Sequence, residues 1–312
     1  MRNALQAVTE ELRRLKTTGI STITVSDEAL AAIRRVVTAR APAGATAVPK
    51  PVIPPISPTP MAPKVERPAV AAKPAVPVAV LPTVTVAALP TAPVVTLPAG
   101  DKAARWEALK AAVGGDPVCR ASVRPGKKVV LGVGNLDAKI MFVGEAPGAD
   151  EEIQGEPFVG PAGQLLTKMI QGMGLARGEV YIGNIMNWRP QMPTLDGREQ
   201  MGNRPPTEDE MRYCLPYLRA QIEVVNPEML VALGSTATQG LLGFKSFKTL
   251  GDVRGRWHDF GGKPLMVTYH PSYILREPTN RKKRMIWEDL LKVMERAALP
   301  ISEKQRGYFL ER

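Results

Sequence analysis

A buried strand that runs directly into an acidic loop rich in glycine and proline restricts the folds open to this chain more than any other feature. The apolar run at 139–143 predicts the strand, and Gly144 and the Pro147-Gly148 turn end it. A loop with five acidic side chains follows, and an apolar-periodic helix is predicted over residues 162–173. This order places carboxylates and free backbone N–H groups at the carboxyl end of a sheet, where ligands bind in open α/β folds.

Two interpretations of this loop are open: an ordinary solvated connection, or a binding loop. Phe158 favours the binding loop, because a large aromatic side chain in a loop needs a surface to pack on. The glycines at 155, 160 and 163 also allow close approach of the backbone. The loop does not match a phosphate-binding P-loop, because no Lys followed by Ser or Thr comes after its glycines.

Strands and helices alternate along the rest of the chain, which predicts a three-layer α/β/α sandwich with a mostly parallel central sheet in one domain. Further strands are expected at 128–132, 179–184, 229–233 and 264–268. Further helices are expected at 106–113, 207–225, 235–242 and 281–298. The helix from 207 opens with a capping box between Thr207 and Glu210. Turn-rich segments are expected at 189–206 and 248–262.

Proline is concentrated in one part of the chain. Residues 41–100 contain 15 of the 30 prolines and no Phe, Trp or Tyr. Such a segment buries too little apolar surface to fold, and its prolines interrupt it too often for a membrane span, so a disordered linker is predicted. Residues 1–40 show helical spacing of leucines and valines and predict a small helical segment. The folded domain is therefore expected at 101–312.

Charge and cysteine content suggest the setting and the class of partner. The net charge of +11 divides into +3 for residues 1–40, +3 for the linker and +5 for the remainder, which suits a polyanion such as nucleic acid. Cys119 and Cys214 are too few for a disulfide framework, and no apolar signal follows the first residues. We expect a cytoplasmic monomer with no membrane partner.

A second cluster of functional residues follows the strand predicted at 264–268. His270 ends this strand and precedes the rigid Pro271 and the hydroxyl of Ser272. The other histidine of the chain, His258, lies in a turn-rich segment and is expected to be structural. The chain therefore carries two candidate sites at strand ends, the acidic loop and the His270 segment.

Together these segments resemble the uracil-DNA glycosylase superfamily, and most closely its bacterial and archaeal family 4. The Gly-Glu-Ala-Pro-Gly string at 144–148 and the Pro-Phe-Val-Gly string at 157–160 are similar to that family's first motif. Residues 181–185 and the His-Pro-Ser string at 270–272 resemble its later motifs. The resemblance covers residues 110–298.

The resemblance implies a site that binds and releases a flipped-out base. A base inside a duplex must leave the stack before an enzyme can act on it. Phe158 would stack on the base, and the Asn184 amide would offer a donor and an acceptor to the uracil edge. His270 would hydrogen-bond the departing base, and Gly144 and Ala146 would complete the binding loop.

A carboxylate is also implied, to stabilise the positive charge on the sugar and to orient water. Relatives outside family 4 carry an Asp where this chain has Ala146. The role must therefore fall to another residue. Glu145 is the first candidate from the family pattern and Glu151 the second.

The segment after His270 is expected to grip DNA. Ser272 would hold a phosphate, and Tyr273, Ile274 or Leu275 would wedge into the vacated stack. Contacts to the DNA backbone carry affinity but no sequence information. Those contacts are expected from Arg276, Arg281, Lys282, Lys283 and Arg284.

The chain departs from family 4 at the iron–sulfur cluster. That family holds the cluster with four cysteines, and the matching positions here read Asp116, Cys119, Trp188 and Cys214. Two thiolates do not make a four-thiolate site. We therefore expect no cofactor, with Trp188 filling the space by packing.

The resemblance implies a DNA-repair enzyme that excises uracil from DNA and leaves an abasic site. Two alternatives stay open. One is a non-catalytic module of the same fold that binds damaged DNA, and the other is a glycosylase with a shifted base range, such as hypoxanthine or a thymine mispair. The expected partner is uracil-containing DNA, and no partner is identified for residues 1–40.

Overall fold

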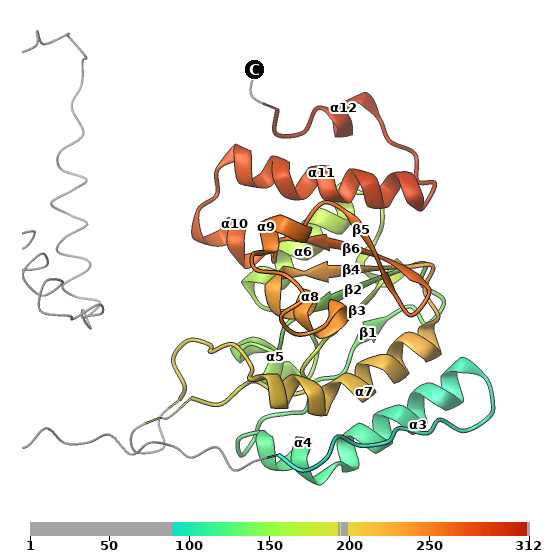
Figure 1. Ribbon diagram of the computed structural model, residues 1–312, viewed down its shortest axis with the longest axis vertical. Coiled ribbons are helices and arrows are strands. Elements are labelled where there is room, and N and C mark those ends of the chain that lie inside the picture. The colour runs from blue at the N-terminus through green and yellow to red at the C-terminus, as the bar shows by residue number, and fades with distance from the viewer. Residues whose placement is uncertain (1–88, 193, 195–198, 311–312) are drawn as a thin grey trace, which may run out of the picture. The chain divides into compact units, whose positions relative to one another are not determined.

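A computed structural model describes residues 89–192, 194 and 199–310. These residues lie in one compact unit (Figure 1). The helical segment expected at 1–40 and the expected linker up to residue 88 lie outside the described residues. No helix among those described is both long and apolar enough to span a bilayer.

A six-stranded sheet forms the middle of this unit, in the order β1-β3-β2-β4-β6-β5. Its four central strands are parallel to one another: β2 (Ile140–Gly144), β3 (Tyr181–Asn184), β4 (Met229–Leu233) and β6 (Lys263–Thr268). The two antiparallel edge strands are β1 (Val133–Gly134) and β5 (Trp257–Phe260). The prediction of a mostly parallel sheet is confirmed.

Helices cover both faces of the sheet. The longer ones are α3 (Lys102–Gly115), α6 (Pro161–Gly172), α7 (Glu208–Val225), α8 (Gly234–Leu242) and α11 (Asn280–Arg296). The short ones are α4 (Pro117–Ser122), α5 (Ala149–Gln154), α9 (Leu250–Val253), α10 (Ser272–Arg276), α12 (Glu303–Arg306) and the 3₁₀ turn η1 (Arg177–Glu179). Figure 1 shows α3 and α7 on one side of the sheet and α11 on the other.

The core consists of two apolar layers, because successive residues of a strand point to opposite faces. Met141 and Val143 of β2 pack with residues of α3, α7 and α8. Ile140 and Phe142 of the same strand pack with residues of α6, α10 and α11. A strand buried on both faces reads as a continuous apolar run, which is why the sequence predicts β2 well. The three-layer architecture is confirmed.

Three local predictions are wrong. Residues 128–132 form no strand, because their backbone groups bond elsewhere: Val130 N donates to Asn187 O (2.8 Å) and Gly132 N donates to Gln221 Oε1 (3.1 Å). The acidic loop contains a helix, α5, and the turn-rich segment 248–262 contains α9 and β5. These elements are short, and β5 pairs on one side only, so their sequences lack a clear period.

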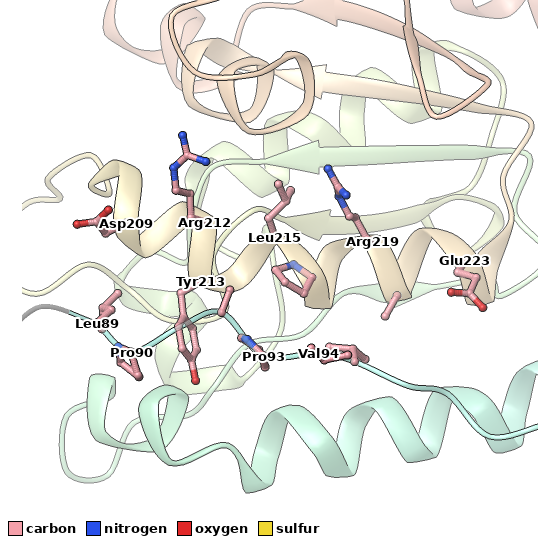
Figure 2. A pocket seen from close by; sticks show the side chains of 14 residues that line it. Leu89, Pro90, Pro93, Val94, Asp209, Arg212, Tyr213, Leu215, Arg219 and Glu223 are labelled. Atoms are coloured by element: carbon pink, nitrogen blue, oxygen red, sulfur yellow. The ribbon is translucent and has the colours of Figure 1, made fainter.

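The end of the predicted linker packs on the folded unit. We call residues 89–97 the strap. Leu89, Val95 and Leu97 of the strap are partly buried against the core layer that contains α3 and α7. Figure 2 shows the strap beside α7. Residues of both segments line a pocket of about 670 Å³. The folded unit therefore begins before residue 101.

The strap leads to a prediction about truncated chains. One shortened chain starts at Ala79 and keeps the strap. A chain that starts at Asp101 loses three partly buried apolar side chains and should be less stable by about 2 kcal/mol. Thermal unfolding of the two shortened chains checks this, and equal stability of both would show that the strap contributes nothing.

Candidate active site

The carboxyl ends of the four parallel strands meet at one cleft of about 830 Å³. Glu145 follows β2, Asn184 ends β3, Thr236 follows β4 and His270 follows β6, and all four line this cleft. Parallel strands end at the same edge of a sheet, so residues far apart in sequence are brought together there. The cleft unites the two candidate sites of the sequence.

Phe158 is held at the base of the cleft by two glycines. Its φ of 56° is unusual for a residue with a side chain, and the residue is only 6% exposed. A Cβ at Gly144 would lie 2.4 Å from both Phe158 Cζ and Asn184 Oδ1. A Cβ at Gly163 would lie 1.8 Å from the Phe158 carbonyl oxygen. Only glycine at both positions allows the aromatic ring to sit where it does.

Asn184 lines the cleft and carries a buried side-chain oxygen. The residue is 6% exposed and is paired in register with Gly144 of the neighbouring strand. Its Oδ1 atom is buried and accepts no hydrogen bond from any of the residues that the structure describes. A buried polar group left unpaired costs about 1–3 kcal/mol, so this atom is poised for a ligand.

His270 lies beside Phe158 as a neutral imidazole. The two ring centroids are 5.5 Å apart and the rings are tilted by 31°. Ser272 N donates to His270 Nδ1 (3.2 Å), and Ser272 Oγ lies 2.8 Å from the same atom. Burial, together with the positive charge of Arg276, lowers the pKa of His270 to about 4. Because a backbone N–H can only donate, Nδ1 is the acceptor and the proton lies on Nε2.

The two candidate carboxylates lie in different environments. Glu145 is half-buried and accepts one hydrogen bond, from Thr236 Oγ1 to Oε2 (2.6 Å). Burial raises the pKa of Glu145, and the Thr236 hydrogen bond acts in the opposite direction. Glu151 is buried, and its oxygens accept from the N–H groups of Gly148 (3.0 Å), Val159 (3.0 Å) and Gly160 (2.9 Å). Its carboxylate is used in holding the loop around Phe158.

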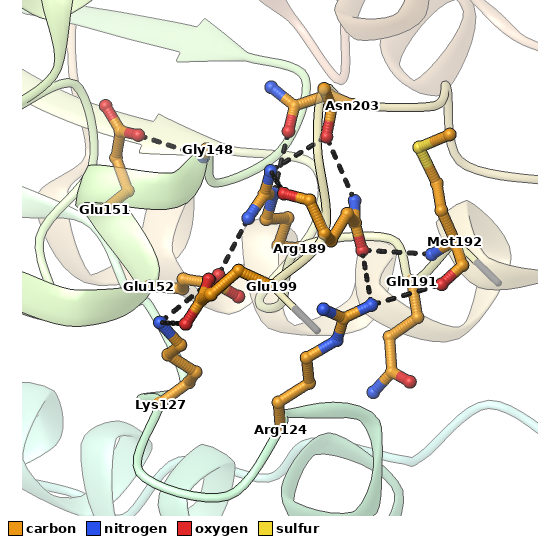
Figure 3. Close-up of polar contacts among 12 residues, drawn as sticks. Arg124, Lys127, Gly148, Glu151, Glu152, Arg189, Gln191, Met192, Glu199 and Asn203 are labelled. Carbon is orange, nitrogen blue, oxygen red and sulfur yellow. Dashed lines mark hydrogen bonds and ion pairs between the residues drawn. The ribbon is translucent and has the colours of Figure 1, made fainter. Parts of the chain in front are cut away.

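A buried arginine joins the segment after β3 to helix α5. Arg189 is 5% exposed, and its Nη1 donates to Glu152 Oε1 (2.8 Å). Its Nε donates to Asn203 Oδ1 (2.7 Å), as Figure 3 illustrates, and its Nη2 donates to Gly202 O (2.8 Å). Gly202 and Asn203 line the cleft. The sequence analysis missed this pair, since neither residue belongs to a periodic pattern and only tertiary contact reveals it.

The three wedge candidates differ in exposure. Ile274 is 6% exposed and packs in the core, so it is not available at the surface. Tyr273 stacks on Tyr269 with ring centroids 4.4 Å apart, and Lys282 Nζ lies 4.4 Å from its ring centre. Leu275 is 46% exposed. Leu275 is therefore the wedge candidate with a free side chain.

The basic run at the start of α11 is only partly free for DNA. Arg276 and Arg281 are exposed. Lys282 pairs with Glu277, and Lys283 Nζ lies 5.8 Å from the ring centre of Phe309. Arg284 donates to Glu288 Oε1 (2.8 Å) and to the carbonyls of Arg306 (2.7 Å) and Tyr308 (3.0 Å). Lys283 and Arg284 therefore support the C-terminal segment as well as the charged surface, and Lys282 is held by Glu277.

The residues at the four family cluster positions form a packed polar and aromatic interior. Asp116 accepts hydrogen bonds from the hydroxyls of Tyr213 and Tyr217 (2.8 Å each) and from Cys119 N (2.7 Å). Trp188 is 2% exposed, with its ring centroid 6.2 Å from that of Tyr213. Cys119 and Cys214 are both buried in this interior as free thiols, and burial raises the pKa of each.

This donor set does not fit an iron–sulfur cluster. Two thiols are present, and the Asp116 carboxylate already accepts three hydrogen bonds. Within the described residues, no three His, Cys, Asp or Glu side chains gather closely enough to hold a metal ion. The purified protein should therefore contain no stoichiometric iron. Iron analysis and visible absorption of anaerobically prepared protein check this, and a band near about 400 nm with matching iron would contradict it.

Comparison with known proteins assigns the family. The family model of the Uracil DNA glycosylase superfamily matches residues 131–291, which include every strand of the sheet and the whole His270 segment. This chain belongs to that superfamily. The prediction from the motifs is confirmed.

The curated relatives place the chain on the type-4 branch of the superfamily. It is 44% identical over 165 residues to the type-4 uracil-DNA glycosylase of Thermotoga maritima, covering 53% of this chain and 80% of the relative. It is 43% identical over 176 residues to that of Saccharolobus solfataricus, covering 54% and 76%. The type-5 uracil-DNA glycosylase of Pyrobaculum aerophilum is 30% identical over 181 residues, covering 53% and 73%. Family 4 is therefore the better match, as the sequence predicts.

Proposed function

We propose that this chain excises uracil from DNA by hydrolysing the N-glycosidic bond of a flipped-out deoxyuridine, which leaves an abasic site. Membership of the superfamily makes the chain a uracil-DNA glycosylase, a hydrolase of DNA repair. The observation that supports the detailed proposal most is that one cleft is lined both by a neutral His270 and by Asn184, whose buried Oδ1 has no hydrogen-bond partner among the described residues.

Recognition of uracil rests on Phe158 and Asn184. The Phe158 ring gives the flipped base a stacking surface. Asn184 Oδ1 accepts from the N3–H of uracil, and its amide nitrogen donates to O4. Cytosine presents the opposite pattern at these two positions, so it would leave buried groups unpaired. These two contacts therefore favour uracil over cytosine.

The chemical step places negative charge on the uracil and positive charge on the sugar, and the cleft supplies a stabilising side chain for each. The C1′–N1 bond breaks with its electron pair going to uracil, and a water oxygen bonds to C1′ of the sugar. His270 Nε2–H donates to the uracil anion as its charge develops, a preorganised electrostatic contribution. Ionised Glu145 stabilises the cationic sugar and takes the proton of the attacking water. Glu151 supports the loop through its three backbone contacts.

Contacts to DNA surround the cleft. Leu275 fills the space left by the flipped base, as apolar wedges do in other DNA-bending proteins. Ser272 lines the cleft and contacts a phosphate of the target strand. Arg276 and Arg281 hold the DNA backbone without reading sequence. Lys282, Lys283 and Arg284 add charge, and Lys283 and Arg284 also contact the C-terminal segment.

An oligonucleotide assay tests the function. The full-length protein is incubated with duplexes that carry a single uracil, hypoxanthine or thymine opposite guanine, and the strands are then treated with alkali. The proposal predicts cleavage at uracil and little at the other two bases. Binding without cleavage would indicate the non-catalytic module, and preferred cleavage at another base would indicate a shifted glycosylase.

A further inference from the structure

Thr236 is the side chain that bonds the half-buried Glu145. It lies in the first turn of α8, just after β4 ends, and it lines the cleft. Its hydroxyl donates to Glu145 Oε2 at 2.6 Å, a short contact typical of a hydroxyl bonded to a carboxylate. Within the described residues, Glu145 has no other side-chain partner. The orientation of the carboxylate therefore depends on this one hydroxyl.

The start of α8 also touches the second catalytic candidate. Gly234 has a φ of 90°, and a Cβ there would lie 2.9 Å from His270 Cβ. The turn from β4 into α8 thus contacts Glu145 through Thr236 and His270 through Gly234. The positive end of the α8 dipole lies at the same place and favours a negative carboxylate. One short turn therefore supports both groups that act on opposite sides of the scissile bond.

Other charged and titratable groups surround Glu145. Those that line the same cleft are Asp150, Glu151, Arg189, Tyr269, His270, Tyr273 and Arg276. The two influences on the pKa of Glu145 are nevertheless burial, which raises it, and the Thr236 hydrogen bond, which lowers it. Glu151 and Arg189 are occupied by the partners described above. Thr236 is thus the one cleft side chain that directly favours the ionised form of Glu145.

We propose that Thr236 is a positioning residue of the active site, whose hydroxyl fixes Oε2 of Glu145, keeps the carboxylate ionised and leaves Oε1 for the attacking water. This inference rests on the proposed function and deepens it. It goes beyond the motif residues, because nothing in the sequence pattern distinguished Thr236 from its neighbours in α8. Thr236 acts through Glu145 and makes no contact with the reacting atoms.

The test compares three variants of the full-length protein. Thr236→Val removes the hydroxyl and keeps the shape, and Thr236→Ser keeps the hydroxyl. Thr238→Val is the matched control, because Thr238 is buried in the same helix, does not line the cleft itself, and donates its hydroxyl to Gly234 O (2.7 Å), so this variant perturbs the same turn without removing a contact to Glu145. Single-turnover uracil release is measured from pH 5 to 9, and the Glu145 carboxyl is titrated by carbon NMR, assigned by comparison with Glu145→Gln.

Thr236→Val should move both the acid limb of the rate profile and the Glu145 titration to higher pH by about one unit, the effect of losing one hydrogen bond to a charged group. At the acid end this is about a tenfold lower rate. Thr236→Ser should restore both, and Thr238→Val should leave both in place. An unmoved Glu145 titration in Thr236→Val overturns the inference. If the wild type releases no uracil, the proposed function fails, while the NMR titration still decides the role of Thr236.

Discussion

Replacing His270 with alanine should lower the single-turnover rate of uracil release by roughly 10²–10³-fold, the scale of one lost preorganised donor. The reason is that Ser272 N donates to Nδ1 and so fixes the only ring proton on Nε2, beside Phe158. The affinity for uracil-containing DNA should change by less than about threefold, because phosphate contacts dominate affinity. Rapid-quench kinetics and a binding titration with a non-cleavable substrate analogue measure the two quantities.

His258 provides the matched control for this variant. It lies in β5 and outside the cleft lining, with Nε2 2.8 Å from Val253 O. His258→Ala should keep the wild-type rate at a temperature where both variants are folded. A wild-type rate in His270→Ala would remove His270 from the mechanism. A loss of the same size in both variants would mean that the effect is one of folding.

Replacing Glu145 with glutamine should lower the same rate by roughly 10²–10⁴-fold, the range for a positioned acid or base. It should also abolish the acid limb of the pH profile. Glu145 acts as an anion, and burial raises its pKa, so the wild-type rate should rise with pH through a midpoint above the ordinary glutamate value and then level off. His270 has a pKa of about 4 and stays neutral over this range, so it adds no second limb.

Two other glutamates of the same segment serve as controls. Glu156 is exposed, and Glu156→Gln should leave rate and profile unchanged. Glu151→Gln weakens the acceptor of three backbone N–H groups. Its main effect should therefore be a lower thermal unfolding temperature rather than a shift of the acid limb of the pH profile. A rate that falls as pH rises from 5 to 7 would contradict the account, since it would require a cationic His270.

The parts of the fold that the sequence predicts are those with strong local patterns. The strand at 139–143, the helix at 162–173 and the capping box at Thr207 are present as expected. The strand expected at 128–132 is absent because a loop carbonyl and a glutamine side chain satisfy its backbone. The sequence cannot show such long-range bonds in advance.

In the candidate site too, the sequence predicts the residues that belong to local motifs and does not predict those that act through long-range contacts. The motif residues Phe158, Asn184 and His270 meet at one cleft, because the carboxyl ends of parallel strands share an edge. Arg189 and Thr236 were not found, since each matters through a contact with a residue 37 or 91 positions away. The sequence also offers no reason to choose among the wedge candidates Tyr273, Ile274 and Leu275, whereas the structure buries Ile274 and exposes Leu275.

The most direct test of the account is the release of free uracil by full-length protein whose iron content is measured in the same sample. Uracil-containing duplex is mixed with excess protein, and the free base and the abasic strand are quantified together. The account predicts one uracil and one abasic site per duplex from protein that carries no stoichiometric iron. Tight binding of the duplex with no free uracil, or release that depends on stoichiometric iron, would contradict it.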